Sequence, residues 1–207
     1  MNSKEHWKNV YQNKSAEEVS WYQAIPTISL SIIRDSGLKK EQAIIDVGGG
    51  ASTLVDSLLQ EGFEDITVLD LSSQALEVAK QRLGERAEAV DWLAEDITQF
   101  SPKKKVFFWH DRAVFHFLTQ SEDRAKYKKI LASSVLSGGY VMIAVFSIGG
   151  PEQCSGLDIV QYDADKIKEA LGVEFKLIDE QVEQHMTPSG NAQLFRYFVF
   201  RKVESAE

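Results

Sequence analysis

The chain of 207 residues is 43% hydrophobic and 26% charged, which is the composition of an ordinary globular domain with a sizeable core. Its 23 Lys and Arg residues against 31 Asp and Glu residues give a formal net charge of −8, so the average surface disfavours nucleic acids and anionic membranes as partners. The single cysteine, Cys154, excludes an internal disulfide, and no Cys/His spacing indicates a metal site. We therefore expect one domain over residues 1–207, with no metal, no nucleic-acid partner and no membrane contact.

The N-terminus is polar, and no apolar stretch of the kind found in a secretory signal follows it. The longest apolar run, residues 140–146, is far too short to span a bilayer. These two observations predict a cytoplasmic protein with no secretory signal and no transmembrane helix.

Residues 1–40 precede the predicted sheet and are expected to form a helical lid. Trp7 and Tyr11 are four residues apart and share a helix face. Trp21 follows a polar stretch, residues 15–18, that predicts a further helix start. Two interpretations stay open: the three aromatic side chains cap the core, or they fold over a ligand and wall its pocket.

Three consecutive glycines, residues 48–50, directly follow a predicted strand over 43–47 and precede a predicted helix over 52–61. Glycine lets a ligand approach the backbone closely, and the start of the helix offers unpaired N–H groups at the same point. A dinucleotide site has the pattern Gly-x-Gly-x-x-Gly, but Thr53 occupies the position of the third glycine. Asp46 lies just ahead of the glycines, where it disfavours a pyrophosphate and favours a ligand with a positive amine.

Asp70 ends the next predicted strand about 20 residues beyond the glycines, where a carboxylate can accept hydrogen bonds from both hydroxyls of a ribose. Residues 45–50 and Asp70, in this order, resemble the first two motifs of the class I methyltransferases. These enzymes bind S-adenosylmethionine, which has an ammonium and a sulfonium but no phosphate. The resemblance implies that Asp96, after the third strand, hydrogen-bonds the adenine amine and that Ile97 covers the adenine ring.

The aromatic pattern of the lid is similar to that of small class I enzymes that include protein lysine methyltransferases, in which these side chains touch the cofactor. S-adenosylmethionine is therefore the predicted cofactor. The resemblance covers nearly the whole chain, and the cofactor-binding residues that we expect are Trp7, Tyr11, Trp21, Asp46, Gly48, Gly49, Gly50, Asp70, Leu71, Asp96, Ile97 and His110.

Predicted strands and helices alternate from residue 43 to residue 172, as in a parallel α/β sheet. The last two strands are joined by a short connection, which predicts an antiparallel hairpin. The resemblance implies a Rossmann-like, doubly wound seven-stranded sheet of order 3-2-1-4-5-7-6, with strand 7 antiparallel and helices on both faces. We expect a cofactor-binding core over 41–146, then a substrate loop and hairpin over 147–207. The expected strands are 43–47, 66–70, 89–93, 106–109, 140–146, 174–181 and 194–201, and the expected helices are 26–35, 52–61, 72–83, 122–136 and one between 163 and 172.

Three polar residues follow the predicted strand 106–109, at the sheet edge where α/β proteins bind ligands. His110 and Asp111 are the candidate catalytic residues, with His110 as a general base because imidazole titrates near neutral pH. The alternative is that His110 contacts the cofactor through its backbone and only shapes the pocket. Arg112 is expected to pair with Asp111 and hold the loop, and His185 is expected in a solvated turn.

The resemblance implies transfer of a methyl group from S-adenosylmethionine by in-line displacement. The sequence does not identify the acceptor, which is a small molecule or a protein side chain. An Asn/Asp-Pro-Pro-Tyr/Phe motif is absent after the fourth strand, which disfavours planar amino groups. Two alternatives are a non-catalytic S-adenosylmethionine-binding protein that acts through a partner and an NAD-linked reductase. Thr53 and the C-terminal hairpin argue against the reductase.

Overall fold

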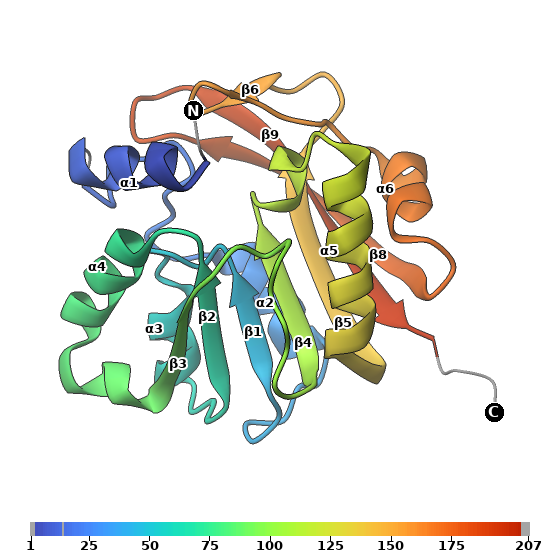
Figure 1. Cartoon of the computed structure of the whole chain (residues 1–207), viewed down its shortest axis with the longest axis horizontal. Helices are drawn as coiled ribbons and strands as arrows, with labels where there is room; N and C mark the ends of the chain where they lie inside the picture. Colours follow the sequence, from blue (N-terminus) through green and yellow to red (C-terminus); the bar gives the residue numbers. More distant parts are fainter. Residues whose placement is uncertain (1–2, 14, 204–207) are drawn as a thin grey trace.

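The computed structural model describes residues 3–13 and 15–203. The strands form a seven-stranded mixed sheet and a small two-stranded hairpin, and helices connect the strands of the large sheet. The strands of the large sheet are β1 (Ile44–Val47), β2 (Ile66–Asp70), β3 (Val90–Ala94), β4 (Val106–Arg112), β5 (Val135–Phe146), β8 (Phe175–Met186) and β9 (Ala192–Lys202). Their order is β3-β2-β1-β4-β5-β9-β8, and β9 runs antiparallel to both of its neighbours (Figure 1). The predicted topology is therefore confirmed.

Alternate residues of the central strands face opposite sides of the sheet and divide the core into two layers. Ile44 and Phe108 pack on one face, and Ile45 and Trp109 pack on the other. The first face is covered by α2 (Thr27–Asp35), α3 (Leu54–Gln60) and α4 (Ser73–Leu83), and the second by α5 (Ser121–Ser134) and α6 (Ala164–Leu171). The central strands are buried on both sides, as predicted for a doubly wound sheet.

Side chains cap the starts of two helices. The hydroxyl of Ser72 accepts a hydrogen bond from the backbone N–H of Ala75 at 3.3 Å, at the start of α4. The carboxylate of Asp163 accepts one from the N–H of Lys166 at 2.9 Å, at the start of α6. These local bonds place both helix starts where the sequence predicts them.

The N-terminal segment lies at the carboxyl end of the sheet, where α1 (Ser3–Asn13) contacts α4 (Figure 1). Residues 15–26, which we name the N-terminal strap, contain turns where the sequence predicts a second helix start. The carboxylate of Glu18 accepts hydrogen bonds from the backbone N–H and the hydroxyl of Ser15, both at 2.8 Å. No helix follows in the strap, because carbonyl oxygens further along it accept hydrogen bonds from distant side chains instead.

β4 continues to Arg112, past the predicted end at Trp109, because the strands on both sides pair with its last residues. His110 lies opposite Asp46 of β1 in this pairing. β5 also starts earlier than predicted, and its first part is irregular, with a positive φ at Gly138. The three polar residues after Trp109 are therefore strand residues, whose side chains alternate between the two faces.

The long connection over 147–162 contains a hairpin of β6 (Gln153–Cys154) and β7 (Leu157–Asp158). Two short 3-10 helices complete the fold: η1 (Gly84–Ala89) precedes β3, and η2 (Phe115–Phe117) follows β4. His185 is 6% exposed within β8, so the expected solvated turn is wrong, because strand pairing continues to Met186. Within residues 3–13 and 15–203, none of the helices combines the length and the apolar character needed to cross a membrane.

Candidate active site

The glycine run turns between β1 and α3 with two carboxylates packed against it. Gly48 and Gly50 have positive φ values of 71° and 40°, a conformation that favours glycine. A Cβ atom on Gly49 would lie 2.5 Å from Asp46 Oδ2, and one on Gly50 would lie 2.7 Å from Asp70 Oδ2. The run therefore presents bare backbone next to Asp46 and Asp70.

A cavity of about 430 Å³ extends from this loop across the ends of β2, β3 and β4. Asp70 and Asp96 line it from successive strand ends, and each accepts a backbone hydrogen bond through Oδ1, from Ser72 at 2.7 Å and from Thr98 at 2.8 Å. Burial raises the pKa of Asp70 to about 7, and the negative charge of Asp46 adds to this shift. Other side chains in the wall are Trp7, Tyr11, Trp21, Leu71, Ile97 and Phe117.

An aromatic cluster from the N-terminal segment forms one wall of this cavity. Trp7 meets Trp21 edge-on with ring centroids 5.5 Å apart and meets Phe117 at 5.1 Å, and Tyr11 meets Trp21 at 6.4 Å. Burial and the nearby charge of Asp70 raise the pKa of Tyr11 above its ordinary value. Of the two open interpretations of the lid, the structure favours the one in which these side chains wall a pocket.

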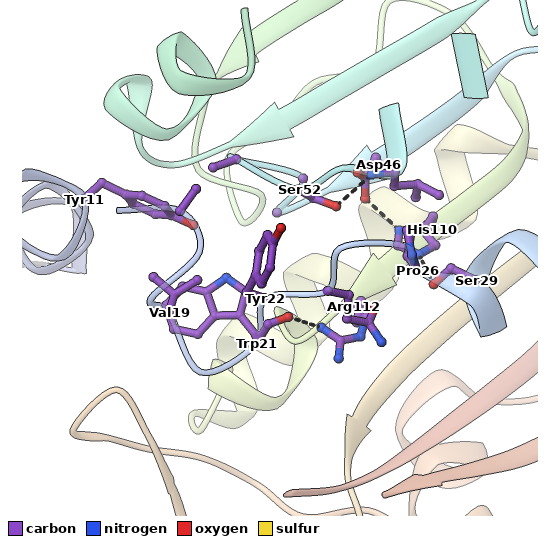
Figure 2. Close-up of a pocket in the computed structure, with 16 residues that line it drawn as sticks. Tyr11, Val19, Trp21, Tyr22, Pro26, Ser29, Asp46, Ser52, His110 and Arg112 are labelled. Atoms are coloured by element: carbon purple, nitrogen blue, oxygen red, sulfur yellow. Dashed lines mark hydrogen bonds and ion pairs between the residues drawn. The ribbon is translucent and has the colours of Figure 1, made fainter. Parts of the chain in front are cut away.

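A smaller cavity adjoins the first, and Tyr11 and Trp21 line both. It contains a buried chain of hydrogen bonds (Figure 2). His110 Nδ1 lies 2.6 Å from Asp46 Oδ1, and His110 Nε2 lies 2.9 Å from the hydroxyl of Ser29 on α2. Asp46 Oδ2 is buried and has no hydrogen-bond partner among the described residues. Both ring nitrogens of His110 are thus occupied, which disfavours the predicted general-base role.

Comparisons with known proteins agree with this geometry. Residues 44–139 match the family described as methyltransferase domain. The eEF1A lysine and N-terminal methyltransferase of Bos taurus is 23% identical over 193 residues, which is 93% of this chain and 26% of that protein. The chain spans about a quarter or less of the length of the curated relatives that it matches.

Solved structures share the whole fold. A structure described as "Conversion of a Disulfide Bond into a Thioacetal Group during Echinomycin Biosynthesis" has a TM-score of 0.76 and 17% identity, and the match covers 100% of this chain and 95% of that one. The N-methyltransferase NodS from Bradyrhizobium japonicum WM9, in complex with S-adenosyl-L-homocysteine, has a TM-score of 0.71 and 17% identity, over 95% of this chain and 98% of that one. Residues 44–139 of this chain therefore match a methyltransferase domain, and the chain as a whole shares the fold of these structures.

The NodS structure holds S-adenosyl-L-homocysteine, which is the product of methyl transfer from S-adenosylmethionine, and the site residues of this chain fit that cofactor. The unpaired oxygen of Asp46 beside the glycine loop suits an ammonium, and Asp70 at the end of β2 suits a ribose. Ile97, which is 6% exposed, offers an apolar surface to adenine next to Asp96. Of the predicted cofactor residues, Gly50 alone lines neither of the two cavities described above.

The structure places Asp111 on the face of the sheet opposite His110. The hydroxyl of Tyr127 donates to Asp111 Oδ2 at 2.6 Å, and the backbone N–H groups of Val114 and Phe115 donate to Oδ1 at 3.0 and 3.3 Å. Asp111 is 0% exposed, and burial raises its pKa to about 6. This geometry disfavours the predicted catalytic role of Asp111, because its carboxylate lines neither cavity and holds the turn between β4 and η2.

Arg112 does not pair with Asp111, because strand alternation puts the two side chains on opposite faces. Its Nε donates to the hydroxyl of Tyr197 at 2.9 Å, and its Nη1 donates to the carbonyl of Trp21 at 2.8 Å. Its Nη2 lies 3.6 Å from Glu183 Oε2. Arg112 lines both cavities and connects the N-terminal strap to the C-terminal hairpin.

Further hydrogen bonds hold the strap over the site. Gln23 Nε2 donates to Glu183 at 2.7 Å, and the hydroxyl of Thr53 donates to the carbonyl of Gln23 at 2.9 Å. His185 Nε2 donates to the carbonyl of Ser20 at 2.8 Å. These contacts could not be predicted from the sequence, because they join segments far apart in the chain. The one local signal was Thr53, a hydrogen-bonding residue where a dinucleotide site has glycine.

Proposed function

We propose that this chain is an enzyme that transfers the methyl group of S-adenosylmethionine to an amine, carried by a small molecule or by a protein side chain. The main evidence for the proposal is the larger cavity. It continues from the two predicted cofactor carboxylates, Asp70 and Asp96, to side chains that the cofactor does not require, among them Asp123, Leu157 and Asp158. A cavity that extends past its cofactor-binding residues has space for a second substrate.

The charge of this wall favours an amine acceptor. Glu95, Asp123 and Asp158 are carboxylic acids in the lining, and Arg112 is the one basic residue among the described residues that line the cavity. The guanidinium of Arg112 is already engaged by the hydrogen bonds described above. Asp123 is paired with Lys126 at 2.8 Å, so an ammonium would mainly meet the negative charge of Glu95 and Asp158. Cys154 also lines the wall, but burial raises its pKa to about 12, so its thiol stays neutral.

Side chains of the cavity can assist the transfer in two ways, by accepting a proton and by surrounding the reactants. When bound, S-adenosylmethionine supplies an electrophilic methyl group on a good leaving group. An alkylammonium acceptor has no lone pair until it loses a proton, and Asp123 and Asp158 are the carboxylates of the wall that can hold it and accept that proton. Trp7 and Phe117 exclude water from the same space, which favours alignment of the two reactants.

The comparisons support nitrogen as the acceptor atom. The relatives from Mus musculus and Bos taurus are named lysine and N-terminal methyltransferases, and NodS is named an N-methyltransferase. An NAD-linked reductase is disfavoured, since the unpaired buried oxygen of Asp46 beside the glycine loop would repel a pyrophosphate.

A labelling assay tests the proposal. The protein is incubated with methyl-labelled S-adenosylmethionine and cell extract, and labelled products are sorted by size. We expect transfer that is lost in Asp70→Asn and kept in Asp65→Asn, a matched change at the other end of β2. Equal transfer by Asp70→Asn would contradict the proposed site. Cofactor binding without transfer to any fraction would instead favour the non-catalytic alternative.

A further inference from the structure

The buried chain formed by Asp46, His110 and Ser29 has the residue types of a Ser-His-Asp triad but not its access. Asp46 is 2% exposed, His110 is 3% exposed and Ser29 is 0% exposed. A nucleophilic serine has to meet its substrate, and Ser29, although it lines the smaller cavity, is a buried residue of α2 whose hydroxyl is held by His110. This chain of hydrogen bonds therefore holds groups in place and does not attack a substrate.

The donors along the chain can be assigned. An ionised carboxylate only accepts hydrogen bonds, so His110 Nδ1 donates to Asp46 Oδ1. In neutral His110, Nε2 then accepts from the hydroxyl of Ser29. Each bond fixes the next group, because α2 holds Ser29, Ser29 orients the imidazole, and the imidazole orients the carboxylate.

The second carboxylate oxygen of Asp46 takes no part in this chain of hydrogen bonds. Oδ1 is occupied by His110, whereas Oδ2 is buried, without a hydrogen-bond partner among the described residues, and close to the position of a Cβ on Gly49. A buried carboxylate oxygen without a partner is unfavourable unless a ligand satisfies it. The same cavity is lined by Gly48 and Gly49, so a cationic group entering here would meet Oδ2 and the backbone of the loop.

We propose that His110, held by Ser29, is a positioning residue for the ammonium of the cofactor, acting through Asp46. The proposal rests on the proposed function, because it places the aminoacyl end of S-adenosylmethionine in the smaller cavity. It replaces the general-base role predicted from the sequence. It requires that His110 matters for ligands that carry the aminoacyl end and not for ligands that lack it.

Two ligands separate this role from a general structural one. S-adenosylhomocysteine carries the aminoacyl end, and 5′-methylthioadenosine has the same adenosine and sulfur without it. Calorimetry with His110→Leu should show an affinity for S-adenosylhomocysteine lower by about 10- to 100-fold, the size expected for losing a hydrogen bond to a charged group. The affinity for 5′-methylthioadenosine should stay within about twofold of wild type.

Further variants keep the test decisive. His110→Asn keeps an N–H donor near the Nδ1 position and should restore most of the affinity, whereas Asp46→Asn should lose it for S-adenosylhomocysteine alone. Thermal unfolding of each variant confirms the fold. An equal loss for both ligands, or no loss for S-adenosylhomocysteine, would overturn the positioning role. Failure of the wild-type protein to bind either ligand would instead overturn the proposed function itself.

Discussion

The two halves of the carboxyl edge of the sheet are built in different ways. At the ends of β2 and β3, each carboxylate predicted to bind the cofactor is held by a backbone N–H two residues later, as Ser72 holds Asp70 and Thr98 holds Asp96. Along β4 and the C-terminal hairpin, polar groups are held by distant side chains, as Arg112 is held by Tyr197 and Glu183.

We call the part along β2 and β3 the local half, because neighbouring backbone groups hold its carboxylates. We call the part along β4 and the C-terminal hairpin the assembled half, because distant side chains hold its polar groups. The local half depends on short motifs, so a single change in the motif should abolish ligand binding. The assembled half depends on the contacts of Arg112 with the N-terminal strap and the hairpin, so variants of these contacts should affect stability before cofactor binding. The predictions below test this division, from the largest expected effect to the smallest.

The glycine loop should be the most sensitive point. Gly49→Ala puts a Cβ 2.5 Å from Asp46 Oδ2 and 2.7 Å from Val68 Cγ1. We expect the affinity for S-adenosylhomocysteine to fall at least about 100-fold and the free energy of unfolding to fall by about 2 kcal/mol. Calorimetry and urea unfolding measure these effects. In the control Gly190→Ala, an added Cβ meets nothing within 4 Å, so the affinity should be unchanged.

The assembled half should respond through stability. Arg112→Met removes the cation beside Glu183, and the side chains of the pair are only 9% and 17% exposed. We expect the free energy of unfolding to fall by about 3 kcal/mol, because an uncompensated carboxylate stays mostly buried. In urea unfolding, the double variant with Glu183→Gln should lose less than the sum of the single losses. Strict additivity would mean that the two residues are not coupled.

Proton binding by Asp70 should make cofactor binding depend on pH. Its pKa is raised from 3.8 to about 7, so the free protein holds this proton below neutrality, whereas a bound cofactor favours the carboxylate. The affinity for S-adenosylhomocysteine should weaken as pH falls below 7, by up to about tenfold per pH unit. The free energy of unfolding has the opposite trend: the contribution of Asp70 is largest below its unfolded pKa and is lost as pH rises to about 7. Calorimetry across this range should show no such dependence in Asp70→Asn.

The acceptor wall should give the smallest effects. Asp158→Asn and Asp123→Asn each remove one negative charge from the wall of the larger cavity. We expect KM for the labelled acceptor to rise by about 3- to 10-fold, with the affinity for S-adenosylhomocysteine unchanged. Steady-state kinetics with the acceptor fraction from the labelling assay measures this. An unchanged KM in both variants would remove the case for a cationic acceptor.

The same division explains what could be predicted from the sequence. The strand order, the glycine loop and the positions of Asp70 and Asp96 follow from spacing and local hydrogen bonding, which are visible in a linear chain. The roles of His110, Asp111 and Arg112 could not be predicted, because β4 is longer than its apolar run. Strand alternation then sends Asp111 into the α5 face and its two neighbours toward the α2 face.

The partners of the misassigned residues come from elsewhere in the chain. Ser29 is a polar residue on the buried face of α2, and Glu183 lies in β8, which continues beyond its predicted end. No spacing rule links these positions to β4. The division into lid, core and hairpin remains a prediction from the sequence.

The central claim is that Asp70 and the glycine loop bind S-adenosylmethionine. Calorimetric titration of S-adenosylhomocysteine into the wild-type protein and Asp70→Asn tests it most directly. We predict saturable binding at one site in the wild type, weakened by at least about 100-fold in Asp70→Asn. No heat of binding in the wild type, or equal affinity in the two proteins, would contradict the claim.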